Sequence, residues 1–286
     1  MVKKVISLDI MALEEKTAPI MLAPTMVYQP YEVQVNYGGV TSTGITAPLE
    51  GNLFLINMNT IEGAHVDSGI KNNINVVNFG EITNSSFNAT QGAHTSFVNY
   101  GTVENSSLSV ANQAETTISN FDTITDSSVT TTDNSLTQAI NKGSIVNSSS
   151  MATDTSLFLL KNDSFVSDIS LTSNNSTSAF VNTGIANNVN MESTNNSQDF
   201  FLNNGFIEDV TVNNTDSKAE IINNQTVENA NINTTRGESL IQNTDTIDQL
   251  SLTGQEATVT LDNSKNGVIK WFNYLFDNRS SFSVFN

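Results

Sequence analysis

Carboxylates are the reactive side chains that this sequence offers in the largest number, because it holds 29 Asp and Glu residues and no cysteine. Two carboxylates held close together could act as general acid and base on a glycan, and several could hold calcium. The acidic residues of the strand-like segments are instead scattered along the chain, and no two Asp residues are adjacent. We therefore predict that the protein is not an enzyme. The scattered positions are Glu81, Glu104, Asp126, Asp168, Glu208 and Asp209.

The remaining candidates for chemistry are few. His65 and His94 are far apart in the sequence, and we expect both to be solvated loop residues rather than a metal site. Arg236 lies in NTTRGES, where we expect a loop charge rather than a catalytic base. Thr130–Thr132 would suit ice binding only if a threonine column repeated at a fixed position, and none does.

Cofactor motifs are also missing from the sequence. The absence of cysteine excludes disulfides, thiolate zinc sites and iron–sulfur clusters. No calcium-binding nonapeptide, phosphate-binding loop or dinucleotide fingerprint occurs. We predict no cofactor. Calcium could still act through the acidic surface, but no motif supports it.

The charge balance narrows the choice of partner. Eleven Lys and Arg against 29 Asp and Glu give a formal net charge of -18. Nucleic acids and anionic lipids are bound by cationic side chains, so neither is expected as a partner. Without a run of about 18 apolar residues, membrane insertion is not expected either. The charge does not exclude a glycan or a host surface as a partner.

The chain that must position any functional group consists to a large extent of small polar residues. Asn, Thr and Ser together account for 108 of the 286 residues, a bias often seen in disordered chains. The hydrophobic fraction is nevertheless 37%, and apolar residues recur throughout the chain. A hydrophobic core is therefore available.

Asparagine recurs with a period of 20 or 21 residues. Three positions relative to this Asn are apolar in eleven of twelve repeats each. They lie two residues before it, four residues after it and nine residues after it. Between the apolar columns, β-branched and aromatic residues alternate over short stretches, which favours strands of three to five residues. We expect the Asn side chains to form a hydrogen-bonded ladder. The ladder residues are Asn36, Asn57, Asn78, Asn99, Asn120, Asn141, Asn162, Asn182, Asn203, Asn223, Asn243 and Asn263.

A bend is expected close to each ladder Asn. Two residues after it, Gly, Asn or Asp stands in nine of the twelve repeats, and these residue types tolerate positive φ. From Asn162 onward the period is mostly 20 instead of 21, which we attribute to the loss of one residue in an outer corner.

Coils of this length with aligned inward positions resemble the parallel β-helix, or β-solenoid, superfamily. The resemblance implies an all-β, right-handed parallel β-helix of about twelve coils, and stacked strands would make it a rod on the order of 55 Å long. It names no particular family. Leucine-rich repeats also carry an Asn ladder, but their leucine frame differs from the Ile, Val and Phe columns here. We expect residues 36–265 to form the solenoid.

The two ends, residues 1–35 and 266–286, depart from the repeat and are expected to cap the stack or to join subunits. The stretch VIKWFNYLFDN is expected to be a short amphipathic helix or a last pair of strands. Apolar residues are dense in both ends. Those expected to take part in assembly are Met21, Leu22, Tyr28, Tyr31, Trp271, Phe272, Tyr274, Phe276, Phe282 and Phe285.

The start of the chain imitates a secretory signal, with Lys3 and Lys4 before apolar residues. Asp9, Glu14 and Glu15 interrupt the apolar stretch, so we expect no cleavable signal peptide. We expect an extracellular or cell-surface protein that is exported by a route sparing the N-terminus, or a virion protein.

These features together favour a structural role. The expected function is a non-enzymatic β-solenoid subunit that binds copies of itself through its terminal segments, in a filament, appendage or matrix fibre. The alternative is a binding module of an adhesin, phage tail fibre or spike, which would often be trimeric. A polysaccharide lyase or hydrolase is a third alternative.

Overall fold

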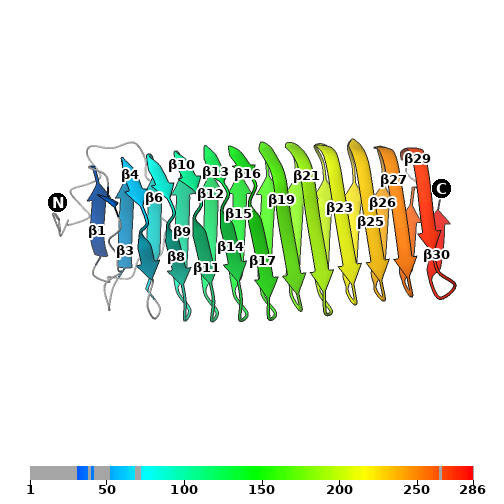
Figure 1. The fold of residues 1–286 in the computed structure, drawn as a ribbon, viewed down its shortest axis with the longest axis horizontal. Helices are drawn as coiled ribbons and strands as arrows, with labels where there is room; N and C mark the ends of the chain where they lie inside the picture. Colours follow the sequence, from blue (N-terminus) through cyan, green and yellow to red (C-terminus); the bar gives the residue numbers. More distant parts are fainter. Residues whose placement is uncertain (1–30, 38–39, 42–51, 68–71, 264–265, 286) are drawn as a thin grey trace.

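A computed structural model describes residues 31–285 except for 38–39, 42–51, 68–71 and 264–265. The described residues form strands, turns and loops and contain no helix, so none of them could form a membrane-spanning helix. The strands wind into a rod of stacked coils, with the N-terminal coils at one end and the C-terminal coils at the other (Figure 1). The expected all-β solenoid is confirmed.

One wall of the rod is a 13-stranded sheet, here called sheet A. All its pairings are parallel, and each strand that ends in a ladder Asn places that Asn beside the next one, as Asn57 beside Asn78. Its strands are β1 (Tyr31–Asn36), β3 (Asn52–Asn57), β6 (Ile74–Asn78), β9 (His94–Asn99), β12 (Glu115–Asn120), β15 (Leu136–Asn141), β18 (Leu157–Asn162), β20 (Thr177–Asn182), β22 (Gln198–Asn203), β24 (Lys218–Asn223), β26 (Glu238–Asn243), β28 (Thr258–Asp262) and β30 (Ser281–Phe285).

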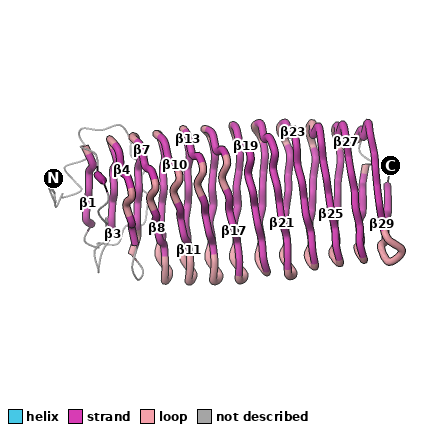
Figure 2. Tube along the Cα trace, viewed as in Figure 1, coloured by secondary structure: helices cyan, strands magenta, loops and turns pink. Residues whose placement is uncertain are grey.

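The opposite wall is a 17-stranded parallel sheet, here called sheet B. Each early coil contributes two short strands to it, and from Phe165 onward each coil contributes one long strand. Figure 2 shows the loops that break the early strands. The strands of sheet B are β2 (Val40–Thr41), β4 (Thr60–Glu62), β5 (His65–Asp67), β7 (Glu81–Thr83), β8 (Ser86–Ala89), β10 (Thr102–Glu104), β11 (Ser107–Val110), β13 (Thr123–Thr125), β14 (Ser128–Thr131), β16 (Ser144–Val146), β17 (Ser149–Thr153), β19 (Phe165–Asn174), β21 (Ile185–Thr194), β23 (Phe206–Thr215), β25 (Val227–Thr235), β27 (Thr246–Gln255) and β29 (Val268–Phe276).

The thirteen strands of sheet A, one per coil, agree with the expected stack of about twelve coils. The right-handed winding stays a prediction.

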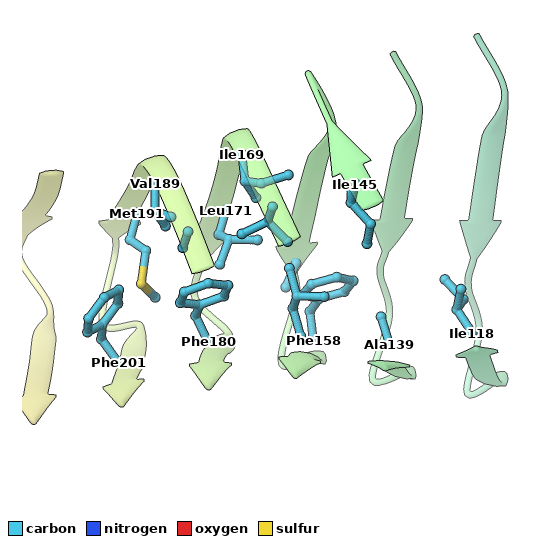
Figure 3. Close-up of a cluster of buried hydrophobic side chains, with 14 of the residues drawn as sticks. Ile118, Ala139, Ile145, Phe158, Ile169, Leu171, Phe180, Val189, Met191 and Phe201 are labelled. Atoms are coloured by element: carbon cyan, nitrogen blue, oxygen red, sulfur yellow. The ribbon is translucent and has the colours of Figure 1, made fainter. Parts of the chain in front are cut away.

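The core lies between the two sheets and runs through the stack as one cluster. Strand residues alternate between buried and more accessible positions, as the β pleat requires. In Figure 3, Phe180 and Phe201 of sheet A point toward Leu171 and Met191 of sheet B. The two phenyl rings have their centroids 5.5 Å apart. Apolar side chains therefore stack along the rod as well as across it.

The shortening of the repeat after Asn162 occurs at one corner, as expected. Thr153 pairs with Asn174 and Leu157 pairs with Thr177, so three residues connect the strands in the first coil and two in the next. The strands on either side keep their register. A corner loop can lose a residue without moving the core.

The expected bend close to each ladder Asn is confirmed, but the described residues two positions after the Asn do not have positive φ. At Gly80 and Gly143 the absence of a side chain serves close packing instead, because a Cβ there would lie 2.0 and 2.1 Å from a carbonyl oxygen of the preceding coil. Positive φ occurs at two other corners, six and thirteen residues after the Asn. The first set is Gly63, Asn84, Asn105, Asp126, Asn147, Asp168 and Asn188, and the second is Gln91, Asn112, Asp133, Asp154, Asn175, Asn195, Asp216, Arg236 and Glu256.

The C-terminal segment adds a last strand to each sheet. β29 pairs with β27 in sheet B, and β30 pairs with β28 in sheet A. Of the two forms expected for VIKWFNYLFDN, the structure contains the strand and not the helix. The last coil therefore follows the path of the coils before it despite its different sequence.

Candidate assembly site

The predicted Asn ladder is confirmed along the whole stack. Each ladder Nδ2 group donates to the Oδ1 atom of the next ladder Asn, from Asn36 to Asn263, over distances of 2.7–3.0 Å. From Asn57 to Asn243 the ladder residues are almost completely buried. The corner of every coil is thereby tied to the corner of the next.

Each ladder amide also satisfies backbone groups, some at its own corner and some in the next coil. Asn141, for example, donates to the carbonyl oxygens of Phe165 at 2.7 Å and Gly143 at 3.2 Å, and its Oδ1 accepts from the Gly143 N–H group. Buried backbone groups that turn a corner cannot all reach a sheet partner. The amide supplies both a donor and an acceptor where they are needed.

Two further ladders of serine hydroxyls at the other corners were missed by the sequence analysis. In the first, the Ser85 N–H donates to Ser106 Oγ and the Ser106 N–H donates to Ser127 Oγ. In the second, the Ser135 N–H donates to Ser156 Oγ, and Ser176 and Ser197 continue the same pattern. A serine column seven residues after the ladder Asn was the available signal for the first of them.

The two histidines lie apart and are solvated, as expected, but they lie in strands rather than in the expected loops. His65 in sheet B pairs with Asp67 at 2.9 Å, and His94 in sheet A pairs with Glu115 at 3.2 Å, with exposed side chains in both pairs. No group of three or more His, Asp or Glu side chains that could hold a metal occurs among the described residues.

Arg236 lies at a coil corner, as expected for a loop charge, with a φ of 49°. Its guanidinium makes two hydrogen bonds to Asp216 of the preceding coil, Nε to Oδ1 at 2.8 Å and Nη2 to Oδ2 at 2.7 Å. These bonds lower the pKa of the Asp216 carboxyl and raise the pKa of the guanidinium. The pair joins two coils at their surface.

One carboxylate of the core stands out. Asp199 in β22 is 5% exposed and accepts hydrogen bonds from the hydroxyls of Ser173 and Ser193 and from the Ser178 N–H group. Desolvation raises the pKa of this carboxyl, although the three hydrogen bonds act in the opposite direction. The sequence analysis did not single it out because its neighbours are distant in sequence.

The C-terminal end of the rod leaves the core columns open. Phe272 and Tyr274 continue the inward columns of Leu250 and Leu252, and their rings pack around Phe282 with centroid distances of 5.4–6.0 Å. They border a hollow of about 440 Å³ between the two sheets. The residues around the hollow are Leu261, Asn263, Ile269, Phe272, Tyr274, Phe282 and Val284.

Several outward side chains of the last coil are apolar and exposed too. Trp271 is 75% exposed and Leu275 is 72% exposed, and Phe285 is also exposed. Phe276 and Phe282 are partly buried against the core. Of the N-terminal residues expected to assemble, Met21, Leu22 and Tyr28 lie outside the described residues, and Tyr31 begins β1.

A groove of about 350 Å³ runs along the outer face of sheet B next to this end. Asp209, Asn229, Gln249 and Trp271 form one column along the groove, because they pair in register on successive strands. Thr211, Asn231, Ser251 and Asn273 form a parallel column on the same face. The tryptophan therefore stands at the end of one of two rows of amide, carboxylate and hydroxyl groups, and Asn273 ends the other.

Comparison of the chain with models of protein families, with curated proteins and with solved structures found no match to any of the three. The geometry described above is therefore the basis for the functional assignment.

Proposed function

We propose that the protein is a non-enzymatic structural subunit that assembles end to end into an extracellular or cell-surface filament, appendage or matrix fibre. The observation that carries this proposal is the last described coil, in which Phe272 and Tyr274 continue core columns and yet are 39% and 58% exposed. Contiguous apolar surface of this kind is typical of protein interfaces.

Hydrogen bonding at the same end supports the proposal. Among the described residues, β29 is paired only with β27, and β30 only with β28. The outer edge of each strand offers backbone N–H and C=O groups to a further strand. A second copy that docks its own strands there would cover the hollow and continue both sheets, as in strand addition.

End-to-end assembly is tested with a variant of the full chain that combines Trp271→Ser, Tyr274→Ser and Leu275→Ser. Wild-type protein should form elongated oligomers in analytical ultracentrifugation and negative-stain electron microscopy. The variant should associate about tenfold or more weakly, because large apolar anchors dominate interface energies. Circular dichroism should show that it keeps its β structure.

The matched control combines Met151→Ser and Ile185→Ser, which remove exposed apolar side chains from the middle of sheet B. This control should assemble like the wild type. Wild-type protein that stays monomeric at high concentration, with or without calcium, would contradict the proposal, as would equal assembly by the end variant.

A second candidate function, a glycan-binding module such as an adhesin, is favoured by the groove beside Trp271. An indole face packs well on the C–H face of a sugar ring, and Asn, Gln and Asp side chains hydrogen-bond its hydroxyls. The net charge of -18 favours a neutral over an acidic glycan.

Trp271 is the only tryptophan, so its fluorescence reports directly on the groove. Titration with a panel of neutral hexasaccharides should shift the emission with a Kd below about 1 mM if the groove binds them. Gln249→Ala with Asn229→Ala should abolish the shift, and Asn190→Ala on the same sheet should not. An unchanged spectrum with every glycan removes this candidate and leaves end-to-end assembly untouched.

A further inference from the structure

The long side of the rod formed by sheet A is apolar on its outer face. In each strand of this sheet, the residues three and one positions before the ladder Asn point away from the core, as the alternating burial of β3 and β22 shows. Fourteen of these 24 residues are apolar. We call this surface the A face. Its apolar residues are Val33, Phe54, Leu159, Ala179, Phe200, Leu240, Val35, Ile56, Val77, Val98, Ile140, Val181, Leu202 and Ile222.

The corresponding outward positions on sheet B have a different composition. At the two outward positions eight and ten residues after the ladder Asn, from His65 to Thr253, the twenty residues are Ser, Thr, Asn, Asp, Glu or His with the single exception of Met151, and the exposed Ile185 lies at a different outward position. Both sheets share the same core and the same solvent. The difference between their outer faces is therefore not a requirement of the fold.

Charged side chains are sparse at the outward positions of the A face, as they are at the twenty sheet B positions, which include Asp67 and Glu192. The 24 outward residues of the A face include only Lys161, Glu220 and Asp262 as charged side chains, although the whole chain carries a net charge of -18. Two acidic rods that approach each other repel least where carboxylates are sparse. The A face is such a surface.

A row of exposed apolar side chains at the neighbouring corner widens the A face. Tyr37, Met58, Phe79, Tyr100 and Phe121 each follow a ladder Asn, and all five are exposed. The ring of Tyr100 stacks on Phe79 with a centroid distance of 5.2 Å and on Phe121 at 4.8 Å. The apolar surface thus continues around one edge of sheet A.

We propose that the A face binds the A face of a second copy of this chain, so that two rods pair side by side. Twelve strands at about 4.8 Å and about four residues per strand at about 3.3 Å give a face of roughly 58 by 13 Å. Pairing would bury about 1,500 Å² in total, within the roughly 1,200–2,000 Å² of a standard specific complex.

A second copy fits this face better than an unrelated partner because the face is straight and repetitive along the rod. A two-fold axis brings the same patch of each copy into contact, so that apolar side chains of one A face meet apolar side chains of the other. Apolar sheet faces pack about 10 Å apart with interdigitating side chains, as in β-sandwiches. The pairing uses neither β29 nor the hollow at the C-terminal end, so it is independent of end-to-end assembly.

The pairing is tested by adding like charges to the A face of the full chain. The variant Ile140→Glu with Leu202→Glu places carboxylates at two outward positions, and Ile140 is already 40% exposed. Wild-type protein should dimerise in analytical ultracentrifugation, more strongly in about 1 M salt because salt screens the repulsion of the acidic rods. The variant should dimerise at least about 100-fold more weakly.

The matched control, Thr130→Glu with Thr172→Glu, adds the same charge to the outer face of sheet B and should leave dimerisation unchanged. The C-terminal end variant should still form side-by-side dimers, which separates this proposal from end-to-end assembly. Equal dimerisation of the A-face variant and its control would overturn the pairing.

Because the chain has no cysteine, the single variant Ile140→Cys gives a specific label. Spin labels at this position should report a distance between two copies in the wild-type background, and this signal should disappear when Leu202→Glu is added. A protein that remains monomeric in high salt, or an A face that binds an insoluble polysaccharide without dimerising, would show that the occupant is not a second copy.

Discussion

At the scale of single residues, a ladder Asn differs from the many surface Asn residues because its amide is used entirely inside the stack. Asn141 is fully buried, receives a hydrogen bond from Asn120 and donates to Asn162. Removing it would leave the side-chain amides of Asn120 and Asn162 without the hydrogen bonds that they make to Asn141. Such orphaned buried groups cost more than the bond itself contributes.

Replacing Asn141 with Ala should therefore lower the free energy of unfolding by about 3 kcal/mol. Chemical unfolding followed by far-UV circular dichroism measures the change. Asn231→Ala, at an exposed outward position of β25, should change stability by less than about 0.5 kcal/mol. Similar losses in both variants would mean that the ladder contributes no more than an ordinary surface amide.

Asp199 provides a residue whose effect depends on pH. Burial raises the pKa of its carboxyl in the folded protein. The unfolded chain thus ionises first as the pH rises, near about 3.9, while the folded protein holds the proton longer. The free energy of unfolding should fall as the pH rises from this value to the raised folded pKa, and stay lower above it.

Asp199→Asn keeps the shape of the side chain and removes the buried charge. The variant should be more stable than the wild type at pH 7, and the difference should shrink toward zero as the pH drops below about 4. Urea unfolding across this pH range measures the trend. Asp168→Asn is the control, because hydrogen bonds from Asn188 and Ser167 lower the pKa of that exposed carboxyl and the change should have the opposite sign. A pH-independent gain for Asp199→Asn would contradict the explanation.

At the scale of strands and corners, the sequence predicts the columns better than it predicts the corners. Apolar side chains at fixed distances from the ladder Asn are required by a shared core, so Leu55, Val76 and Phe97 reveal the inward positions. The same residue types can form a corner with several different backbone conformations. Glycine at position 80 signals either positive φ or close packing, and only the three-dimensional structure distinguishes the two.

The serine ladders show a second limit of sequence reasoning at this scale. Serine is so frequent in the chain that a column such as Ser85, Ser106 and Ser127 is hard to separate from background. Its role depends on an N–H group of one coil meeting a hydroxyl of the next, which requires the corner geometry. Asparagine was recognisable because apolar columns on both sides fixed its register.

At the scale of the whole molecule, the sequence predicts an elongated stack but not which surfaces of the stack differ. The strand of residues 268–276 has an irregular sequence, yet it follows the path of β27 and leaves its apolar residues at the end of the core. The contrast between the A face and the opposite wall also appears only once the pleat assigns each residue to the inside or the outside. To predict the surface properties, one must therefore know the strand register, whereas the apolar core columns can be recognised in the sequence itself.

The Asn ladder also gives the rod a direction. In all its hydrogen bonds the N–H group points from one coil toward the next coil on the C-terminal side, as from Asn99 to Asn120 and from Asn120 to Asn141. Aligned hydrogen bonds of this kind polarise one another and their dipoles add. A fibre built head to tail from such subunits has two chemically different ends, and monomers should join these ends at unequal rates.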